Sequence, residues 1–186
     1  GKCLVDLAFG KDERRVTPYR QEDIKSVSKE TTFQEDVFDF SFLEDVLFLL
    51  ALRVSKRAKK LGLYAEGVSI KITYSNMKTI TRSTLILGST RNAYVIYENA
   101  LKLLDHVPRG RVRLIGTGLY HMREEECRQL SFSDVFEHER VLEESKEKIK
   151  WEKMEERYKI KLYKNRESIL EGAGTYMLIE EMRKRI

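Results

Sequence analysis

The chain has 186 residues, 35% of them charged and 10% aromatic, with a formal net charge of +5 at pH 7, which suits one domain of about 100–150 residues plus an additional segment. Its cysteines (Cys3, Cys127) and histidines (His106, His121, His138) lack the spacing of a disulfide framework or a metal site. Because there is neither a signal peptide nor an apolar run of about 20 residues, we expect a cytoplasmic protein.

The first residues indicate the end of a helix followed by a linker. A short apolar turn gives way to a polar, charged run that Pro18 interrupts, all within residues 1–24. There is no initiator Met, so we expect the chain to begin inside a longer protein. Residues 24–37 suit an exposed strand, since Val27 and Phe33 lie in a run rich in Ser and Thr.

Apolar spacing predicts a strong amphipathic helix over residues 40–63. The positions that recur at helical spacing are Phe42, Val46, Leu47, Leu50, Ala51, Val54 and Ala58. Ser41, with Glu44 three residues later, has the pattern of a capping box, which predicts that Ser41 is the N-cap. Four basic residues lie in the last turn before Gly62, where the helix is expected to end.

Two strands of a hairpin follow. In residues 65–76 the side chains alternate, with Val68, Ile70, Ile72 and Tyr74 expected to face inward and Ser69, Lys71 and Thr73 outward. A turn then leads into a strand that opens on SNMKTITRST (75–84) and continues through Leu85 and Leu87. This opening is unusual for a strand, because Lys78 and Arg82 lie among several hydroxyl groups.

A second helix is predicted over residues 90–107 and a last strand over residues 109–122. The apolar face of the helix is formed by Ala93, Ile96, Tyr97, Ala100, Leu101 and Leu104. In the strand, Val112 and Leu114 alternate with Arg111 and Arg113.

The order β-α-β-β-α-β predicts an α+β domain over residues 25–122, with a four-stranded antiparallel sheet and two helices on one face. A mainly helical tail follows at 123–186. The free face of the sheet would collect the outward side chains of Ser26, Lys29, Thr31, Lys71, Thr73, Thr79, Thr81, Arg82, Ser83, Arg111 and Arg113. Strict alternation separates Thr79 from Arg82, so a bulge or an edge contact would be needed for both to reach one ligand.

The positive charge is concentrated in this domain. Residues 25–122 carry 15 Lys and Arg against 9 Asp and Glu, whereas residues 1–24 are balanced and residues 123–186 carry 15 against 16. Because hydroxyls and main-chain amides position phosphates while Lys and Arg supply charge, the free face suits a nucleic-acid backbone. An ordinary solvated sheet face is the alternative. The central strands lack the exposed aromatic pair of an RRM-type RNA-binding sheet.

Three stretches stand out in order along the chain: KSVSKETTF (25–33), YSNMKTITRSTLI (74–86) and RVRLIGTGLYHM (111–122). Together with FGKDERRVTPYRQED (9–23), they resemble the end of the thumb, the linker and the little finger of Y-family translesion DNA polymerases, on the DNA polymerase IV branch. The resemblance covers about residues 1–122.

This resemblance implies a little finger that grips primer–template duplex DNA in the major groove, mostly through phosphates. The implied contacts are the main chain of Ser26, Val27 and Ser28, together with Lys29, Thr79, Ile80, Thr81, Arg82 and Ser83. Arg111 and Arg113 are further candidates, although RVRLIG also suits an ordinary strand. Ser28 stands where Gly is common in the family, and this departure leaves the assignment intact.

The same resemblance implies an error-prone DNA polymerase, a nucleotidyltransferase of DNA damage repair, whose palm domain holds Mg²⁺ on acidic residues. That palm would precede residue 1. Asp12 and Glu13 lie in a polar linker and lack the strand context of such a site. We therefore expect this chain to bind DNA without polymerising it, and to carry no catalytic residue, metal or cofactor of its own.

In the tail, the sequence Gln129-Leu130-Ser131-Phe132 resembles the short peptide that binds the bacterial sliding clamp, with one usual apolar position absent. Small apolar anchors would insert into a pocket while the Gln129 amide fixes the orientation, so Gln129, Leu130 and Phe132 are the candidate contacts. The alternative is that Leu130 and Phe132 staple the next helix, with Ser131 and Asp134 as a capping pair.

Residues 138–168 predict a long, highly charged helix. Leu142, Ile149 and Trp151 are too sparse for a firm coiled coil, so we expect a solvated helix, with a partner helix as the alternative. The last residues, 170–186, are expected to dock weakly or to stay mobile.

Two other classes of function compete with DNA binding. A ferredoxin-like adaptor would bind protein through its helices or tail and would have no DNA affinity. A small enzyme on this scaffold is the weaker alternative, because no nucleophile, paired base or carboxylate cluster can be named.

Overall fold

The computed structural model describes residues 2–13, 15, 24–124 and 134–186. Its sheet-and-helix domain consists of β1 (Ser26–Val37), α2 (Phe40–Lys60), β2 (Tyr64–Tyr74), β3 (Thr79–Thr90), α3 (Ala93–Asp105) and β4 (Val112–Arg123). A short helix, α1 (Lys2–Ala8), precedes it. The elements that follow it are α4 (Asp134–Tyr158), η2 (Tyr163–Asn165), α5 (Arg166–Ile169) and α6 (Gly174–Arg183).

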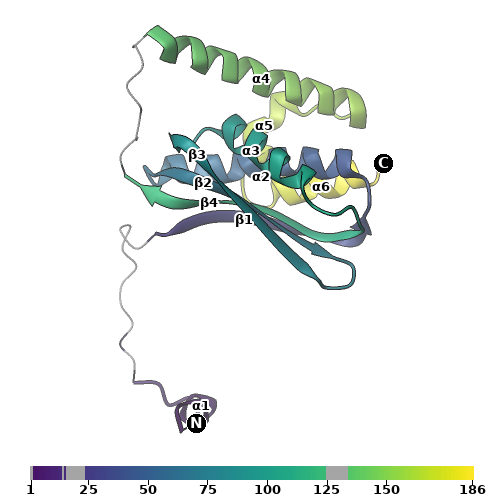
Figure 1. The fold of residues 1–186 in the computed structure, drawn as a ribbon. Coiled ribbons are helices and arrows are strands. Elements are labelled where there is room, and N and C mark those ends of the chain that lie inside the picture. Colours follow the sequence, from purple (N-terminus) through teal and green to yellow (C-terminus); the bar gives the residue numbers. More distant parts are fainter. Residues whose placement is uncertain (1, 14, 16–23, 125–133) are drawn as a thin grey trace.

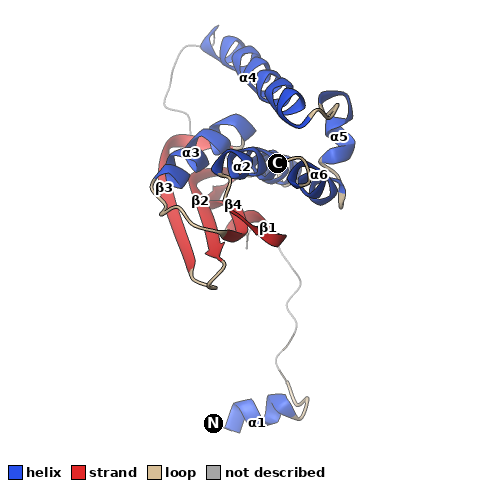
Figure 2. Ribbon diagram, turned by 90° about the vertical axis from the view of Figure 1, so that its right-hand side faces the viewer, coloured by secondary structure: helices blue, strands red, loops and turns tan. Residues whose placement is uncertain are grey.

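The four strands form one antiparallel sheet in the spatial order β1-β4-β2-β3. Figures 1 and 2 show α2 and α3 on one face of this sheet, with the other face open. The predicted α+β class, the four strands and the two helices on one face are therefore confirmed. The last strand begins at Val112, later than predicted, so Arg111 precedes it.

The start of α2 differs from the prediction. Asp39 is the N-cap, and its carboxylate accepts hydrogen bonds from the backbone N–H groups of Ser41 (2.8 Å) and Phe42 (3.3 Å). The predicted capping box with Ser41 as the N-cap is wrong, because the extended backbone at Asp39 starts the helix earlier. A carboxylate also suits the positive end of the helix dipole.

Helix α2 is buried around almost its whole circumference. The residues predicted for its core face are buried, and so are Leu43, Phe48, Leu49 and Leu52, which lie outside that predicted set. Such a helix needs cover on the side away from the sheet. Figures 1 and 2 show that cover: α6 lies beside α2 in the helical layer, and α4 crosses outside it.

The prediction of a solvated α4 is therefore wrong. Trp151, Met154 and Tyr158, spaced i, i+3 and i+7 along one stripe, are each at most 2% exposed. The ring centroids of Trp151 and Phe48 lie 5.5 Å apart, and those of Tyr158 and Phe42 lie 6.4 Å apart. Three large residues on one stripe thus dock a helix that is too polar to form a coiled coil.

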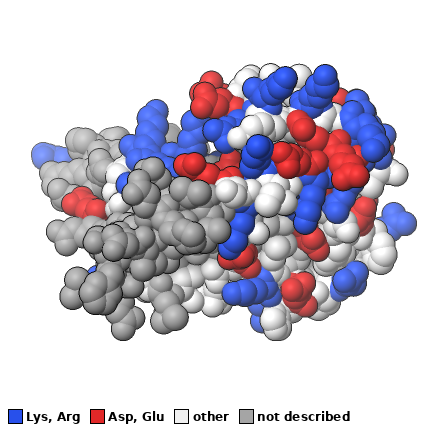
Figure 3. Space-filling model, turned by 90° about the horizontal axis from the view of Figure 1, so that it is seen from above, with Lys and Arg blue, Asp and Glu red and all other residues white. Residues whose placement is uncertain are grey.

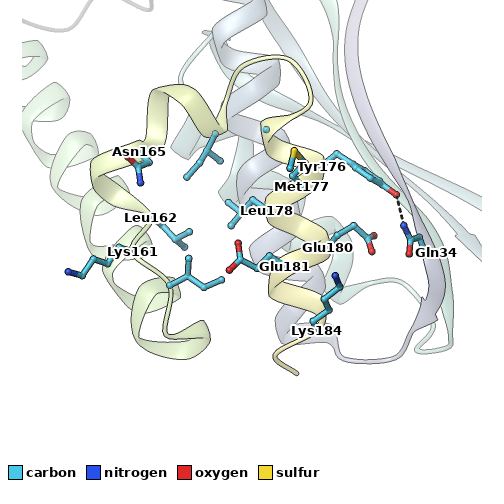
Figure 4. Close-up of a pocket in the computed structure, with 13 residues that line it drawn as sticks. Gln34, Lys161, Leu162, Asn165, Tyr176, Met177, Leu178, Glu180, Glu181 and Lys184 are labelled. Atoms are coloured by element: carbon cyan, nitrogen blue, oxygen red, sulfur yellow. Dashed lines mark hydrogen bonds between the residues drawn. The ribbon is translucent and has the colours of Figure 1, made fainter.

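The end of the chain docks as well. Helix α6 buries Leu178, Ile179 and Met182. It also contacts the C-terminal half of β1. There the Gln34 side-chain amide lies 3.4 Å from the Tyr176 hydroxyl (Figure 4). Arg183 forms an ion pair with Glu35 at 3.0 Å. The expectation of a weakly docked or mobile end is not met by this buried helix.

A buried carboxylate ties α4 to α2. Asp45 is 1% exposed and lies 2.6 Å from the Lys150 ammonium, 2.6 Å from the Arg157 guanidinium and 2.8 Å from the Tyr158 hydroxyl. Burial, with the Asp45 carboxylate nearby, raises the pKa of the Tyr158 hydroxyl, so this group stays a hydrogen-bond donor. Asp45 therefore orients three side chains of the tail at once.

Replacing Asp45 by Ala is expected to lower the free energy of unfolding by about 3 kcal/mol, because it leaves buried donors and a largely buried Lys150 without their acceptor. Urea denaturation of the full chain measures this change. The matched control is Glu171→Gln, which removes the exposed Lys56–Glu171 pair and should cost at most about 0.5 kcal/mol. Equal midpoints for the two variants would contradict the role of Asp45.

Candidate nucleic-acid interface

The strand register assigns each side chain of the sheet to one of its two faces. Directly paired residues of neighbouring antiparallel strands point to the same side. Val27, Leu119 and Val68 pair across three strands and are buried beneath the helices. Each set of directly paired residues across the strands forms a row. Because side chains alternate along each strand, every second row, starting with those next to this one, must point to the open face.

Four rows of paired residues make up the open face. In the order β1, β4, β2, β3, they are Ser26–Tyr120–Gly67–Leu85, Ser28–Gly118–Ser69–Ser83, Glu30–Gly116–Lys71–Thr81 and Thr32–Leu114–Thr73–Thr79. Hydroxyl groups recur in every row, and all four strands contribute at least one. We call these sixteen residues the open face.

Because of its glycines, β4 has no protruding side chains in the middle of the open face. A Cβ atom at Gly118 would lie 2.9 Å from the Ser28 Cβ, and one at Gly116 would lie 2.7 Å from the Glu30 Cβ. At one end of the face the Tyr120 ring lies directly over Gly67, where an added Cβ would be 2.2 Å from the ring. The result is a hydroxyl-lined surface whose central strand carries no side chains in two successive open-face rows.

Six of the predicted free-face residues do lie on the open face, and so does the main-chain candidate Ser28; the six are Ser26, Lys71, Thr73, Thr79, Thr81 and Ser83. Sequence reasoning missed Glu30 and Tyr120. The position of Glu30 follows from the alternation in β1 that places Ser26 and Ser28 outward. The position of Tyr120 does not follow from the predicted alternation of β4, because a pairing irregularity between Val112 and Leu114 puts Leu114, which was predicted inward, on the open face.

Three predicted free-face residues register on the helix-covered side instead, which corrects the prediction. Lys29 and Arg82 belong to one row, Lys29–Thr117–Ile70–Arg82, and Thr31 pairs with the buried Ile115 and is itself only 8% exposed. Lys29 and Arg82 are nevertheless exposed, because β1 and β3 are the edge strands of the sheet. The edge contact that Arg82 needs to share a ligand with Thr79 is thus available.

The main-chain candidate Val27 and the predicted contact Ile80 have side chains that turn inward. Val27 is buried and Ile80 is half-buried, since each belongs to a row beneath the helices. Only their backbone groups are placed to meet a ligand.

Arg111 and Arg113 lie where β4 begins, beside the tip of the β2–β3 hairpin. The Arg111 carbonyl accepts a hydrogen bond from the Ser75 N–H at 2.9 Å, and the Arg111 side chain is exposed. Arg113 lies at an irregularity of the strand pairing, and its Nε is 3.1 Å from the Asp36 carboxylate. Arg113 is thus held by an internal ion pair, whereas no ion pair to a described residue holds Arg111.

The width of the sheet matches a groove of DNA. Three spacings of about 4.8 Å separate β1 from β3, which puts the edge strands about 14 Å apart. The major groove of B-DNA is about 12 Å wide. Lys29 and Arg82 sit in one row at opposite edges, so long cationic side chains flank a neutral, hydroxyl-bearing centre.

The helical side of the molecule has a different character. Figure 3 looks down on the α4 side and shows Lys and Arg interspersed with Asp and Glu, without a broad area of one sign. A pocket of about 630 Å³ lies between α6 and residues 160–165 and is lined mainly by tail side chains (Figure 4). Glu181, which lines it, pairs with Arg185 at 3.0 Å.

Within the described ranges, no group of three or more His, Cys, Asp or Glu side chains is arranged to hold a metal ion. None of the helices described there is both long and apolar enough to cross a membrane. The clamp-peptide candidates Gln129, Leu130 and Phe132 lie outside the described residues.

Residues 24–132 match the family model described as the impB/mucB/samB family C-terminal domain. The tail from residue 134 onward lies beyond this match. The chain is 36% identical over 120 residues to DNA polymerase IV of Caulobacter vibrioides, covering 64% of this chain and 29% of that protein. It is 34% identical over 138 residues to DNA polymerase IV of Clostridium perfringens, covering 71% of this chain and 38% of that protein.

The chain therefore spans about a third of the length of these curated relatives. Among solved structures, it is similar to a complex of beta-clamp processivity factor and the little finger domain of PolIV, at 23% identity and a TM-score of 0.46, covering 58% of this chain and 98% of that one. A Y-family DNA polymerase chimera, Dbh-Dpo4(243-245)-Dbh, is similar at 16% identity and a TM-score of 0.46, covering 67% and 35%.

Replacing Gly116 by Ala tests the row assignment. The new Cβ would meet the Glu30 Cβ at 2.7 Å and the Lys29 carbonyl oxygen at 3.2 Å, so β1 and β4 must shift apart. We expect a loss of about 1–3 kcal/mol in the free energy of unfolding, measured in urea. Thr81→Ala, an exposed position of the same row, is the control and should change it by less than about 0.5 kcal/mol. A Gly116→Ala variant as stable as this control would show that Glu30 does not crowd Gly116.

Proposed function

The chain belongs to the impB/mucB/samB family, the C-terminal domain of Y-family DNA polymerases, and from this premise we propose that residues 25–122 bind the backbone of duplex primer–template DNA. The protein from which the chain comes is then an error-prone translesion DNA polymerase. The observation that carries the proposal is the open face, with its hydroxyl rows between two cation-bearing edges.

The geometry supports a grip that straddles the major groove. Exposed hydroxyls of Ser28, Ser83 and Thr81 can hydrogen-bond phosphate oxygens, and the outward backbone amides of the edge strands can do the same. Lys29 and Arg82 would neutralise phosphates on either side of the groove. None of these contacts reads base identity, so the binding should not depend on sequence.

The chemistry of synthesis is assigned to the rest of the protein. DNA polymerase activity needs Mg²⁺ held by carboxylates in a palm domain. The similar proteins named DNA polymerase IV are about three times longer than the matched part. We propose that this chain positions the duplex and that by itself it does not extend a primer.

A protein-binding adaptor is less well supported. Its natural surface would be the outer side of the helical layer, and α4 and α6 already cover α2 there. The open face, by contrast, carries no covering element in the described part of the chain.

Binding of this chain to a labelled duplex, followed by fluorescence anisotropy across salt concentrations, tests the proposal. We expect a log–log slope of about −3 to −5 that is unchanged when the DNA sequence is scrambled. Arg82→Ala should reduce the slope by about one unit, because it removes one phosphate contact. Lys102→Ala, an exposed cation at the end of α3, should leave the slope unchanged.

Absence of binding even at low salt would remove the DNA proposal and leave the adaptor. A slope that falls equally in Arg82→Ala and Lys102→Ala would mean that net charge, and not the sheet edge, governs binding.

For the tail we propose a second partner, a bacterial sliding clamp, which Gln129, Leu130 and Phe132 would contact. The support is the Gln-Leu-Ser-Phe pattern directly after the little finger. A similar solved structure is a complex of beta-clamp processivity factor and the little finger domain of PolIV.

A Leu130→Ala/Phe132→Ala double variant should lose most of its binding to an immobilised bacterial sliding clamp in surface plasmon resonance, since the apolar anchors are gone. Helix content and the urea midpoint should stay the same. Unchanged clamp binding with a lowered midpoint would support the alternative, in which Leu130 and Phe132 staple the start of α4.

A further inference from the structure

The centre of the open face contains an ion pair that neutralises the cation there. The Lys71 ammonium on β2 lies 2.9 Å from the Glu30 carboxylate on β1, and their side chains are 44% and 50% exposed. Glu30 and Lys71 are the charged side chains among the sixteen residues of the open face. The face that we propose for a polyanion therefore has no net charge of its own.

Gly116 makes this pair possible. Glu30 and Lys71 lie in one row on either side of β4, two strand spacings or about 10 Å apart along the sheet. The residue between them is Gly116, and an added Cβ there would already crowd the Glu30 Cβ at 2.7 Å. With no side chain at Gly116, the two long side chains can meet above the central strand.

We propose that Glu30 limits the affinity of this surface for DNA by holding Lys71 and by placing a carboxylate where phosphates approach. This inference rests on the proposed function of the open face. Lys71 is then a latent phosphate contact, and Glu30 is the residue that sets how tightly the sheet holds the duplex.

The energetics favour an effect on binding over an effect on folding. An exposed ion pair contributes at most about 1 kcal/mol to stability, so its loss is small for the fold. A freed Lys71 adds one cation at the centre of the interface, and each neutralised phosphate changes the log–log salt slope by about 0.9. Removing the Glu30 charge also removes its repulsion of the DNA backbone.

A second pair on the same edge strand follows the same pattern. Asp36, also on β1, holds Arg113 of β4 at 3.1 Å. Acidic residues of β1 thus engage two of the cations that sequence analysis assigned to the free face, Lys71 and Arg113. The edge cations Lys29 and Arg82, in contrast, have no ion-pair partner among the described residues.

The test is a double-mutant cycle with Glu30→Gln, Lys71→Ala and the double variant, measured by anisotropy on one labelled duplex across salt concentrations. Glu30→Gln should bind about tenfold more tightly at low salt, and its slope should steepen by about one unit. Lys71→Ala should change the slope little in the wild-type background but should abolish the gain in the Glu30→Gln background.

Glu66→Gln is the matched control, because it neutralises one partner of the Arg123–Glu66 pair (2.8 Å) and makes the same charge change. Glu66 lies outside the four rows of the open face, at the end of β2 where the pairing with β3 is irregular. We expect the log–log salt slope of DNA binding by Glu66→Gln to equal that of the wild type. We also expect the urea midpoint of Glu30→Gln to stay close to that of the wild type.

The inference would be overturned if Glu30→Gln and Glu66→Gln had the same DNA affinity and the same salt slope. It would also be overturned if Lys71→Ala alone lowered the salt slope by a full unit. Either result with intact wild-type binding would leave the proposed function standing. A wild-type chain that does not bind DNA would overturn the proposed function and this inference with it.

Discussion

The burial of α2 is the constraint on which the rest of this molecule depends. The helix has apolar side chains on nearly every side, so the sheet can cover only part of it. Helix α3 packs beside it, α6 covers it on the other side and α4 closes the outside. Asp45, the one buried carboxylate of α2, is compatible with this burial only because Lys150, Arg157 and Tyr158 reach it from α4.

This packing decides where a ligand can bind. The tail occupies the outer side of α2, and α2 and α3 occupy one side of the sheet, so the open face remains as the broad surface of the sheet that no described element covers. Flexibility is not needed to present it, because every strand is held by its neighbours and by the core beneath. The sheet is a rigid platform, which suits the positioning of a long, regular ligand better than the enclosure of a small one.

Periodicity was sufficient to predict the strands and helices of residues 25–122 and their order, but not the elements of the tail. The alternation in β2 correctly separated Val68, Ile70 and Ile72 from Ser69, Lys71 and Thr73, because one face of that strand is buried. Features that depend on distant parts of the chain were not predictable in this way. Only the register across four strands showed that Lys29 and Arg82 share one row and lie at opposite edges of the sheet.

Two further errors have the same kind of cause. Asp39 and Ser41 are both good N-caps by residue type, and the backbone leaving β1 decides between them. The helix over residues 138–168 was judged against a long coiled-coil repeat from Leu142, Ile149 and Trp151. The stripe that docks it, Trp151, Met154 and Tyr158, needed to fill only one short site on α2. The partner of that stripe lies about 100 residues earlier, where a local pattern cannot reveal it.

The distribution of charge fits a surface that holds DNA without locking onto it. A strong central cluster of free cations would give tight, salt-sensitive binding that opposes movement along the duplex. Here the centre offers hydroxyls and a closed Glu30–Lys71 pair, and the free cations stand at the edges, where water and salt reach them. Contacts of this kind cost little to break one at a time. On the proposed function, such contacts would place the duplex in register while leaving it free to advance, and a polymerase requires both properties of the domain that holds its product.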